Sequence, residues 1–268
     1  MEKTGFIGYG SMGSMIINGL LSSNVLHPEK IMLATRTESK LATLKKEYPE
    51  IEVVHENREI AQKCDKIFLF VGTGDLKGVI KEINEYLMED VHIIYISAGL
   101  ALYDVGTVFK GKLTKVIPTL TSKIGEGVSL VCHNQEVDQK DLEFVDKIFS
   151  ALGYVKVVDE SDLEVATVLT SCAPAFIAVI IRKFAEAGSR RSSFSYEETE
   201  EMVLKTFYGT SKLLYNEKMA LEEVVSKVAT PGGVTEEGVN LLEGDLPQLF
   251  DKLFRISLGK HEVLKGEF

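Results

Sequence analysis

A glycine-rich turn near the start of the chain is the first segment that could bind a ligand. The sequence reads Gly8-Tyr9-Gly10-Ser11-Met12-Gly13 directly after a short apolar run. The first glycine permits a tight bend, the second lets the backbone approach a pyrophosphate, and the third allows a following helix to pack closely. A helix predicted over residues 11–22 would direct free N–H groups and its positive dipole end at the phosphates. These six residues therefore predict a dinucleotide site.

The segment at the end of the second predicted strand indicates which dinucleotide binds. In NAD sites an acid about twenty residues past the glycines accepts hydrogen bonds from the ribose 2′-OH, whereas an arginine accommodates the 2′-phosphate of NADP. Here the segment is Ala34-Thr35-Arg36-Thr37, which contains no acid. Arg36 between two hydroxyl side chains predicts NADPH, with NADP preferred over NAD. The alternative is that Thr37 caps the next helix and Arg36 is a solvated charge.

A second candidate site lies far downstream, in Thr230-Pro231-Gly232-Gly233-Val234-Thr235 before a predicted helix. Proline and paired glycines make a tight connection that leaves N–H groups open at a helix start, which suits a small carboxylate. The Thr235 hydroxyl could cap that helix or contact a ligand. Taken by itself, the pattern favours a plain helix–helix turn with a threonine cap.

Strands alternate with helices in the first part of the chain, which must position the glycine turn. Apolar runs of strand length lie at residues 30–35, 51–54, 66–71, 92–97, 114–117, 128–132 and 155–158. Amphipathic stretches at residues 39–47, 76–87 and 139–152 separate several of them. Continuously apolar strands indicate burial on both faces, and the alternation indicates βαβ units. We therefore predict an α/β, Rossmann-like doubly wound sheet over residues 1–158 as the NADP-binding domain.

The chain after residue 159 is expected to be all-helical. Capping boxes at Ser161–Glu164 and Ser195–Glu198 predict two long helices, the first running to about Ala187. Shorter helices are predicted over residues 221–228, 235–242 and 246–263. So few helices cannot cover all the apolar side chains they carry, and residues 159–268 are therefore expected to pair with a second copy as a homodimer.

Composition narrows the classes of partner. A formal net charge of −10 over 268 residues argues against nucleic acid, which needs a basic face. Cys64, Cys132 and Cys172 form no CxxC pair, as is typical of a reduced cytoplasmic protein, and the histidines lack metal-ligand spacing, so no metal site is expected. No segment approaches the ~20 uninterrupted apolar residues of a membrane span. The N-terminus is already a strand, so no signal peptide is expected.

These motifs resemble the pyrroline-5-carboxylate reductase family almost from end to end. The residues 6–13 are similar to its first turn, Ser97-Ala98-Gly99 to its fifth-strand segment, and Val116-Ile117-Pro118 to its Met-Pro-Asn region. Ser171-Cys172-Ala173-Pro174-Ala175-Phe176 resembles its Gly-Ser-Gly-Pro-Ala-Tyr motif. The segment 230–235 resembles its Ser-Pro-Gly-Gly-Thr-Thr signature, which is the most specific of these matches.

The resemblance implies NADPH-dependent reduction of a cyclic imine carboxylate, above all 1-pyrroline-5-carboxylate to L-proline in proline biosynthesis. It implies that Thr235 lies beside the imine nitrogen as the catalytic residue. It implies a substrate-binding set that comprises Thr230, Gly232, Gly233 and Val234, and it adds to the cofactor-binding set Val71, Ala98 and Gly99. It also implies a homodimer through the helical domain that can assemble into a larger ring.

The chain departs from the family pattern in ways that bear on chemistry. Where the family has Val-Lys-Pro, this chain has Val71-Gly72-Thr73. Thr119 stands in place of the asparagine of the Met-Pro-Asn region, Ala173 in place of a glycine, and Val234 in place of the first threonine of the signature. Glu236 and Glu237 add two negative charges to the first turn of the helix expected to hold a carboxylate. These departures motivate an alternative, a paralogue that binds NADP(H) but acts on another imine or has a regulatory, non-catalytic role.

Overall fold

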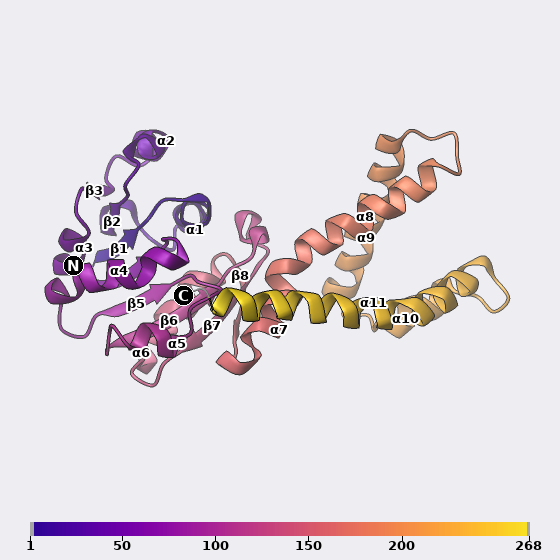
Figure 1. The fold of residues 1–268 in the computed structure, drawn as a ribbon. Coiled ribbons are helices and arrows are strands. Elements are labelled where there is room, and N and C mark those ends of the chain that lie inside the picture. The colour runs from indigo at the N-terminus through magenta and orange to yellow at the C-terminus, as the bar shows by residue number, and fades with distance from the viewer. Residues whose placement is uncertain (1–2, 267–268) are drawn as a thin grey trace. The chain divides into compact units, whose positions relative to one another are not determined.

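The computed structural model describes residues 3–266, which form two compact units (Figure 1). The first contains the chain through Ser171 and the residues from Leu258 onward, and the second is Cys172–Ser257. The predicted fold class is confirmed, because a Rossmann-like unit is followed by helices throughout.

An eight-stranded sheet forms the centre of the first unit, in the order β3-β2-β1-β4-β5-β6-β7-β8. Its strands are β1 (Lys3–Ile7), β2 (Ile31–Ala34), β3 (Glu52–Val54), β4 (Cys64–Leu69), β5 (His92–Tyr95), β6 (Lys112–Ile117), β7 (Gly127–His133) and β8 (Gly153–Val157). Neighbouring strands are parallel except that β7 is antiparallel to β6. The connection between those two strands is too short for the crossover that a parallel pair requires.

Helices cover both faces of this sheet. They are α1 (Ser11–Ser22), α2 (Ala42–Glu47), α3 (Asn57–Lys63), α4 (Thr73–Ile83), α5 (Leu102–Gly106), α6 (Gln139–Ser150) and α7 (Leu163–Thr167). One buried cluster packs α1 and α6 on the sheet, and a second packs α3, α4 and α5 on the other face. The strands are apolar on both sides because both sides are covered.

The second unit consists of α8 (Ala173–Ser189), α9 (Tyr196–Asn216), α10 (Leu221–Val228) and α11 (Val234–Lys265), which continues into the first unit. The capping box at Ser195 is confirmed, since Ser195 and Glu198 exchange hydrogen bonds at 3.2 and 2.7 Å. The box at Ser161 is wrong, because that residue lies within a 3₁₀ turn. The two separate helices predicted after residue 235 are also wrong, since α11 continues through Pro247 at the loss of one backbone hydrogen bond.

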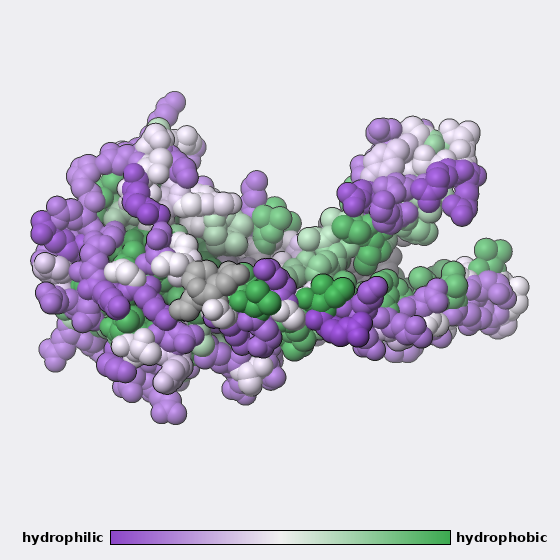
Figure 2. All heavy atoms as spheres, viewed as in Figure 1, coloured by the Kyte–Doolittle hydropathy of each residue, from purple (hydrophilic) through white to green (hydrophobic). Residues whose placement is uncertain are grey.

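Apolar side chains of the second unit are largely exposed. Among its described residues only Ala185 and Thr199 are buried, whereas Phe184 is 63% exposed. Figure 2 shows hydrophobic residues gathered along α8. A helical unit with so little core of its own requires a partner surface.

One helical stretch, Glu160–Ser189, is long and apolar enough to cross a membrane by length and composition, with 17% of its most apolar window buried. The sequence criterion is an uninterrupted apolar run, and Thr167, Thr170 and Ser171 interrupt this stretch. Its mean hydropathy is nevertheless high, because most of its other side chains are strongly apolar. Length and composition do not distinguish a lipid-facing helix from one that packs on protein.

A network of charged side chains lies at the amino ends of the central strands. Asp141 on α6 is 1% exposed, and its two carboxylate oxygens each lie 2.7 Å from a lysine Nζ, that of Lys66 and that of Lys112. His92 is fully buried, with its Nδ1 3.6 Å from the Asp141 carboxylate and its Nε2 2.6 Å from the Thr114 hydroxyl. The network joins α6 to β4, β5 and β6.

Burial alone would raise the pKa of Asp141, but the hydrogen bonds from Lys112 and Lys66 outweigh it and lower that pKa. Burial lowers the pKa of His92 well below its ordinary value, despite the Asp141 carboxylate beside it. Both groups therefore bind fewer protons in the folded chain than in the unfolded one. Stability from His92 falls as the pH drops below about 6.5, and that from Asp141 as it drops below about 4.

The network predicts a large effect of the substitution Asp141→Asn. The loss of the carboxylate leaves two nearly buried ammonium groups without their central partner, so the free energy of unfolding should fall by about 3 kcal/mol. Asp146→Asn on the exposed side of the same helix is the matched control and should change it by less than about 0.5 kcal/mol. Urea unfolding at neutral pH measures both, and equal effects of the two variants would contradict this role of the network.

Candidate functional site

The glycine turn lies where β1 ends and α1 begins. Gly8 has φ +107°, and a Cβ atom there would lie 2.4 Å from the carbonyl oxygen of Phe70. A Cβ at Gly13 would lie 2.9 Å from the carbonyl oxygen of Gly8, so the start of α1 packs directly on the turn. Two of the three glycines are therefore required by the protein's own backbone.

Gly10 differs, because a Cβ atom there would meet nothing within 4 Å. Gly10 is the N-cap of α1 and, having no side chain, cannot cap the helix; the first turn of α1 also holds no acid. The first N–H groups of a helix have no intrahelical acceptor. The open space at Gly10 and the free donors of α1 fit the pyrophosphate of a dinucleotide.

A cleft of about 520 Å³ opens beside this turn, at the carboxyl ends of β1, β2 and β4. Its lining includes the predicted residues Gly8, Tyr9, Gly10, Arg36 and Val71. The strand order changes direction at β1, and in open α/β sheets ligands bind at such a switch point. The structure thus brings the two halves of the predicted cofactor site together.

The remaining predicted cofactor residues occupy different positions. Tyr9 is largely buried, and its hydroxyl donates to Asn18 Oδ1 at 3.2 Å, so its side chain is tied to α1. Ser11 lines a neighbouring cavity of about 660 Å³ between α1 and residues 120–125. Met12 is 36% exposed.

Ala98 and Gly99 lie in the turn after β5 rather than in the lining of the cleft. The hydroxyls of Thr73 and Ser97 are 3.2 Å apart, and Ser97 Oγ also accepts from the Leu100 amide at 3.1 Å. This pair of bonds ties the turn to the start of α4, which forms one wall of the cleft.

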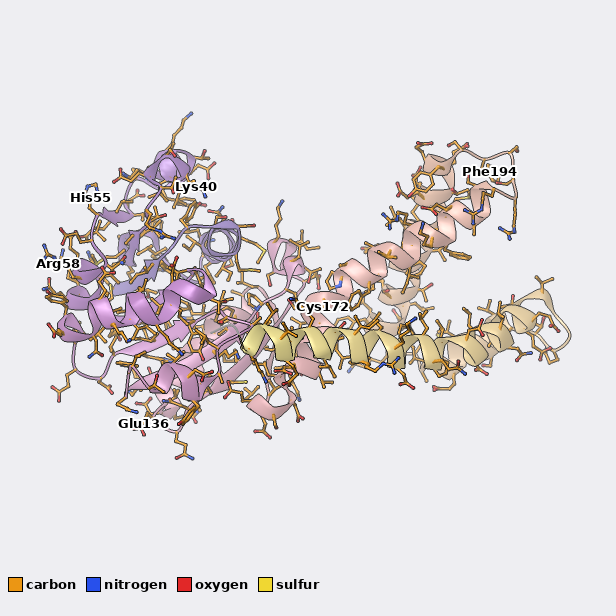
Figure 3. The ribbon with its side chains drawn as sticks, in the orientation of Figure 1. Lys40, His55, Arg58, Glu136, Cys172 and Phe194 are labelled. Carbon is orange, nitrogen blue, oxygen red and sulfur yellow. The ribbon has the colours of Figure 1, made fainter. Side chains whose placement is uncertain are left out.

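Arg36 is held across the cleft by a residue that the sequence did not indicate. Its Nη2 lies 2.9 Å from Asp75 Oδ2 in the first turn of α4, and both side chains are substantially exposed. Lys40 lines the same cleft, and His55 and Arg58 line an adjoining cavity (Figure 3). Lys40 follows β2, whereas His55 and Arg58 follow β3, so no single sequence motif predicts that these three residues lie near one another.

Thr119, at the position of the family asparagine, points inward. It is 1% exposed, and its hydroxyl accepts from the Val128 amide and pairs with Thr121, both at 2.9 Å. Its side chain therefore stabilises the loop after β6.

The segment 230–235 forms a tight loop between α10 and α11 in the second unit. Gly232 has φ +73°, and the Gly233 amide donates to the Thr230 carbonyl at 2.9 Å. The Gly232 amide donates to Glu236 Oε2 at 2.7 Å. Thr235 is exposed in the first turn of α11, and Val234 is 94% exposed. The predicted substrate residues are thus together, and the amides of Gly232 and Gly233 already have acceptors within the loop and α11.

Two family models match the chain. The model of pyrroline-5-carboxylate reductase dimerisation matches residues 160–263, and that of NADP oxidoreductase, coenzyme F420-dependent, matches residues 3–99. Pyrroline-5-carboxylate reductase 3 of Bacillus subtilis is 34% identical over 98% of this chain and 97% of its own length.

Solved structures agree in fold. A pyrroline-5-carboxylate reductase from Coxiella burnetii superposes with a TM-score of 0.91 at 25% identity, over 98% of both chains. A pyrroline carboxylate reductase from Plasmodium falciparum, solved with NADP bound, superposes with a TM-score of 0.83 at 24% identity, also over 98% of both.

Substitutions of the two glycines should separate folding from ligand binding. Gly10→Ala meets no protein atom, so its Tm should stay within about 4 °C of wild type, while the methyl group at the phosphate path raises the Kd for NADPH about tenfold or more. Gly8→Ala collides with Phe70 and should unfold the chain or lower its Tm by far more. Thermal melts and fluorescence titration with NADPH test this, and unchanged NADPH affinity in Gly10→Ala would refute the site.

Proposed function

The chain belongs to the pyrroline-5-carboxylate reductase family, and we propose that it reduces 1-pyrroline-5-carboxylate to L-proline, with NADPH as the reductant. It is an oxidoreductase that acts on a C=N bond and uses NADP(H). The observation that carries the proposal is that one chain combines the dinucleotide cleft at Gly10 with the Pro-Gly-Gly loop and Thr235 at the start of α11.

The chain's own contribution to the reaction is position and a proton. The bound cofactor supplies a hydride, with its two electrons, to the imine carbon. The amides at the start of α11 hold the substrate carboxylate, since a helix N-terminus favours an anion. The Thr235 hydroxyl orients the imine nitrogen and relays to it one proton from water, because a threonine is a poor acid by itself. These groups fix a reactive geometry that would be rare in solution.

Arg36 supports a preference for NADPH over NADH. Its guanidinium lines the cleft at the end of β2, where a 2′-phosphate would lie, and a planar guanidinium suits phosphate oxygens. Lys40 lines the same cleft and adds positive charge. Asp75 keeps Arg36 over the cleft and is the group that a phosphate would displace.

The exposed apolar surface of α8 supports assembly through the helical part. Subunits oligomerise through residues 160–263, as homodimers that can join into a larger ring. This arrangement covers the apolar stretch of Glu160–Ser189 with protein, in an enzyme that works in the cytoplasm. The NADP-binding domain then corresponds to residues 1–158, and the substrate and dimerisation domain to residues 159–268.

Turnover is the direct test of the function. Purified protein should oxidise NADPH only when 1-pyrroline-5-carboxylate is added, and Thr235→Ala should lower kcat/KM by about 10²-fold, because the hydroxyl beside the imine nitrogen is lost. Thr235→Ser, which keeps the hydroxyl, should restore most of the rate. Protein that binds NADPH but leaves this substrate unchanged would contradict the proposal and direct the search to other cyclic imines.

Cofactor preference is tested separately at Arg36. Arg36→Ala should raise the KM for NADPH about tenfold, through loss of charge-assisted hydrogen bonds to the 2′-phosphate, and change the KM for NADH by less than about threefold. Lys45→Ala removes an exposed positive charge from nearby α2 and is the control. Steady-state kinetics with both cofactors measure the effect, and equal changes for NADPH and NADH would remove Arg36 from the site.

A further inference from the structure

Glu236 places a carboxylate of the protein itself on the loop expected to hold the substrate carboxylate. Its Oε2 accepts a hydrogen bond of 2.7 Å from the Gly232 amide, four residues earlier in the chain. Glu236 lies in the first turn of α11, next to Thr235. The contact therefore joins the two parts of the proposed substrate site, within one compact unit.

The loop geometry explains why Gly232 is the donor that Glu236 meets. The positive φ of Gly232 turns the chain back, and the next amide, that of Gly233, is used inside the turn on the Thr230 carbonyl. A Cβ at Gly233 would lie 2.6 Å from the Thr230 hydroxyl, so this turn is fixed. The Gly232 amide is not used inside the turn and is directed at Glu236 instead. A Cβ on Gly232 would meet nothing within 4 Å, so there is open space beside this residue.

The carboxylate of Glu236 has no cationic partner among the residues that the structure describes. Within residues 3–266 Glu236 forms no salt bridge, so the Gly232 amide and the helix start are what stabilise its carboxylate there. A substrate carboxylate would seek the same donors. Two carboxylates at hydrogen-bond distance from one N–H group repel each other, and one of them must leave.

We propose that Glu236 occupies the carboxylate position of the substrate-free enzyme and thereby lowers its affinity for substrate. Substrate binds when the Glu236 side chain, which is only partly buried, rotates into solvent. Glu236 is thus an affinity-setting residue for cyclic amino-acid carboxylates. The proposal rests on the proposed function, because it assigns a role to a residue of that substrate site.

The test uses the full-length protein with saturating NADPH. Glu236→Ala and Glu236→Gln should each lower the KM for 1-pyrroline-5-carboxylate by about three- to tenfold, because each removes one competing charge. The kcat of both variants should stay close to that of the wild type. The control is Glu237→Gln, which removes a neighbouring exposed charge that makes no hydrogen bond or ion pair within the described range. The KM of this control should stay within about twofold of wild type.

An unchanged or higher KM in Glu236→Ala would overturn the proposal, because Glu236 would then support the loop rather than compete with substrate. An equal decrease in Glu237→Gln would also overturn it, since general charge near the helix would explain the effect. Calorimetric titration of L-proline into the protein with NADP⁺ gives an independent reading, and Glu236→Ala should bind three- to tenfold more tightly. If the wild-type protein showed no turnover, the proposed function would be contradicted. The role of Glu236 would still be tested by the L-proline titration, which needs no turnover.

Discussion

The close approach of Gly8 to the backbone of Phe70 is the contact on which the rest of the first unit depends. β1 and β4 stay paired to their last residues, and the Phe70 amide still donates to the Ile7 carbonyl at 2.8 Å. The chain must then reverse into α1 within three residues, which only a residue without a side chain permits there. Because the turn is this tight, α1 begins directly at the carboxyl end of β1, and its free amides face the cleft.

The sequence predicts those features of the structure that depend on residues close together in the chain. Glycine spacing gave the turn, continuous apolar runs gave the strands, and Arg36 was recognised from its place after β2. Contacts between distant segments could not be predicted in this way. Asp75, which holds Arg36, lies 39 residues away in the chain, and the inward direction of Thr119 depends on the Val128 amide.

The helical part shows a different limit of sequence reasoning. Its exposed apolar side chains predicted a partner, but the stretch Glu160–Ser189 also meets the length and composition of a membrane span. Hydropathy reports only that water is unfavourable, and it does not say whether lipid or protein replaces it. The family match over residues 160–263 to a dimerisation domain identifies protein as the partner.

The chain leaves the first unit after Ser171 and rejoins it at Leu258, so the helical unit is an insertion rather than an appendage. The returning end of α11 pairs Lys265 with Glu164, which lies before the insertion. A protease that cuts a loop of the helices once would therefore leave a C-terminal fragment that still carries its own anchor to the sheet unit. Such a nicked chain has the properties of a split protein whose two fragments remain associated. A denaturing gel would show two fragments, while under native conditions they would still migrate together.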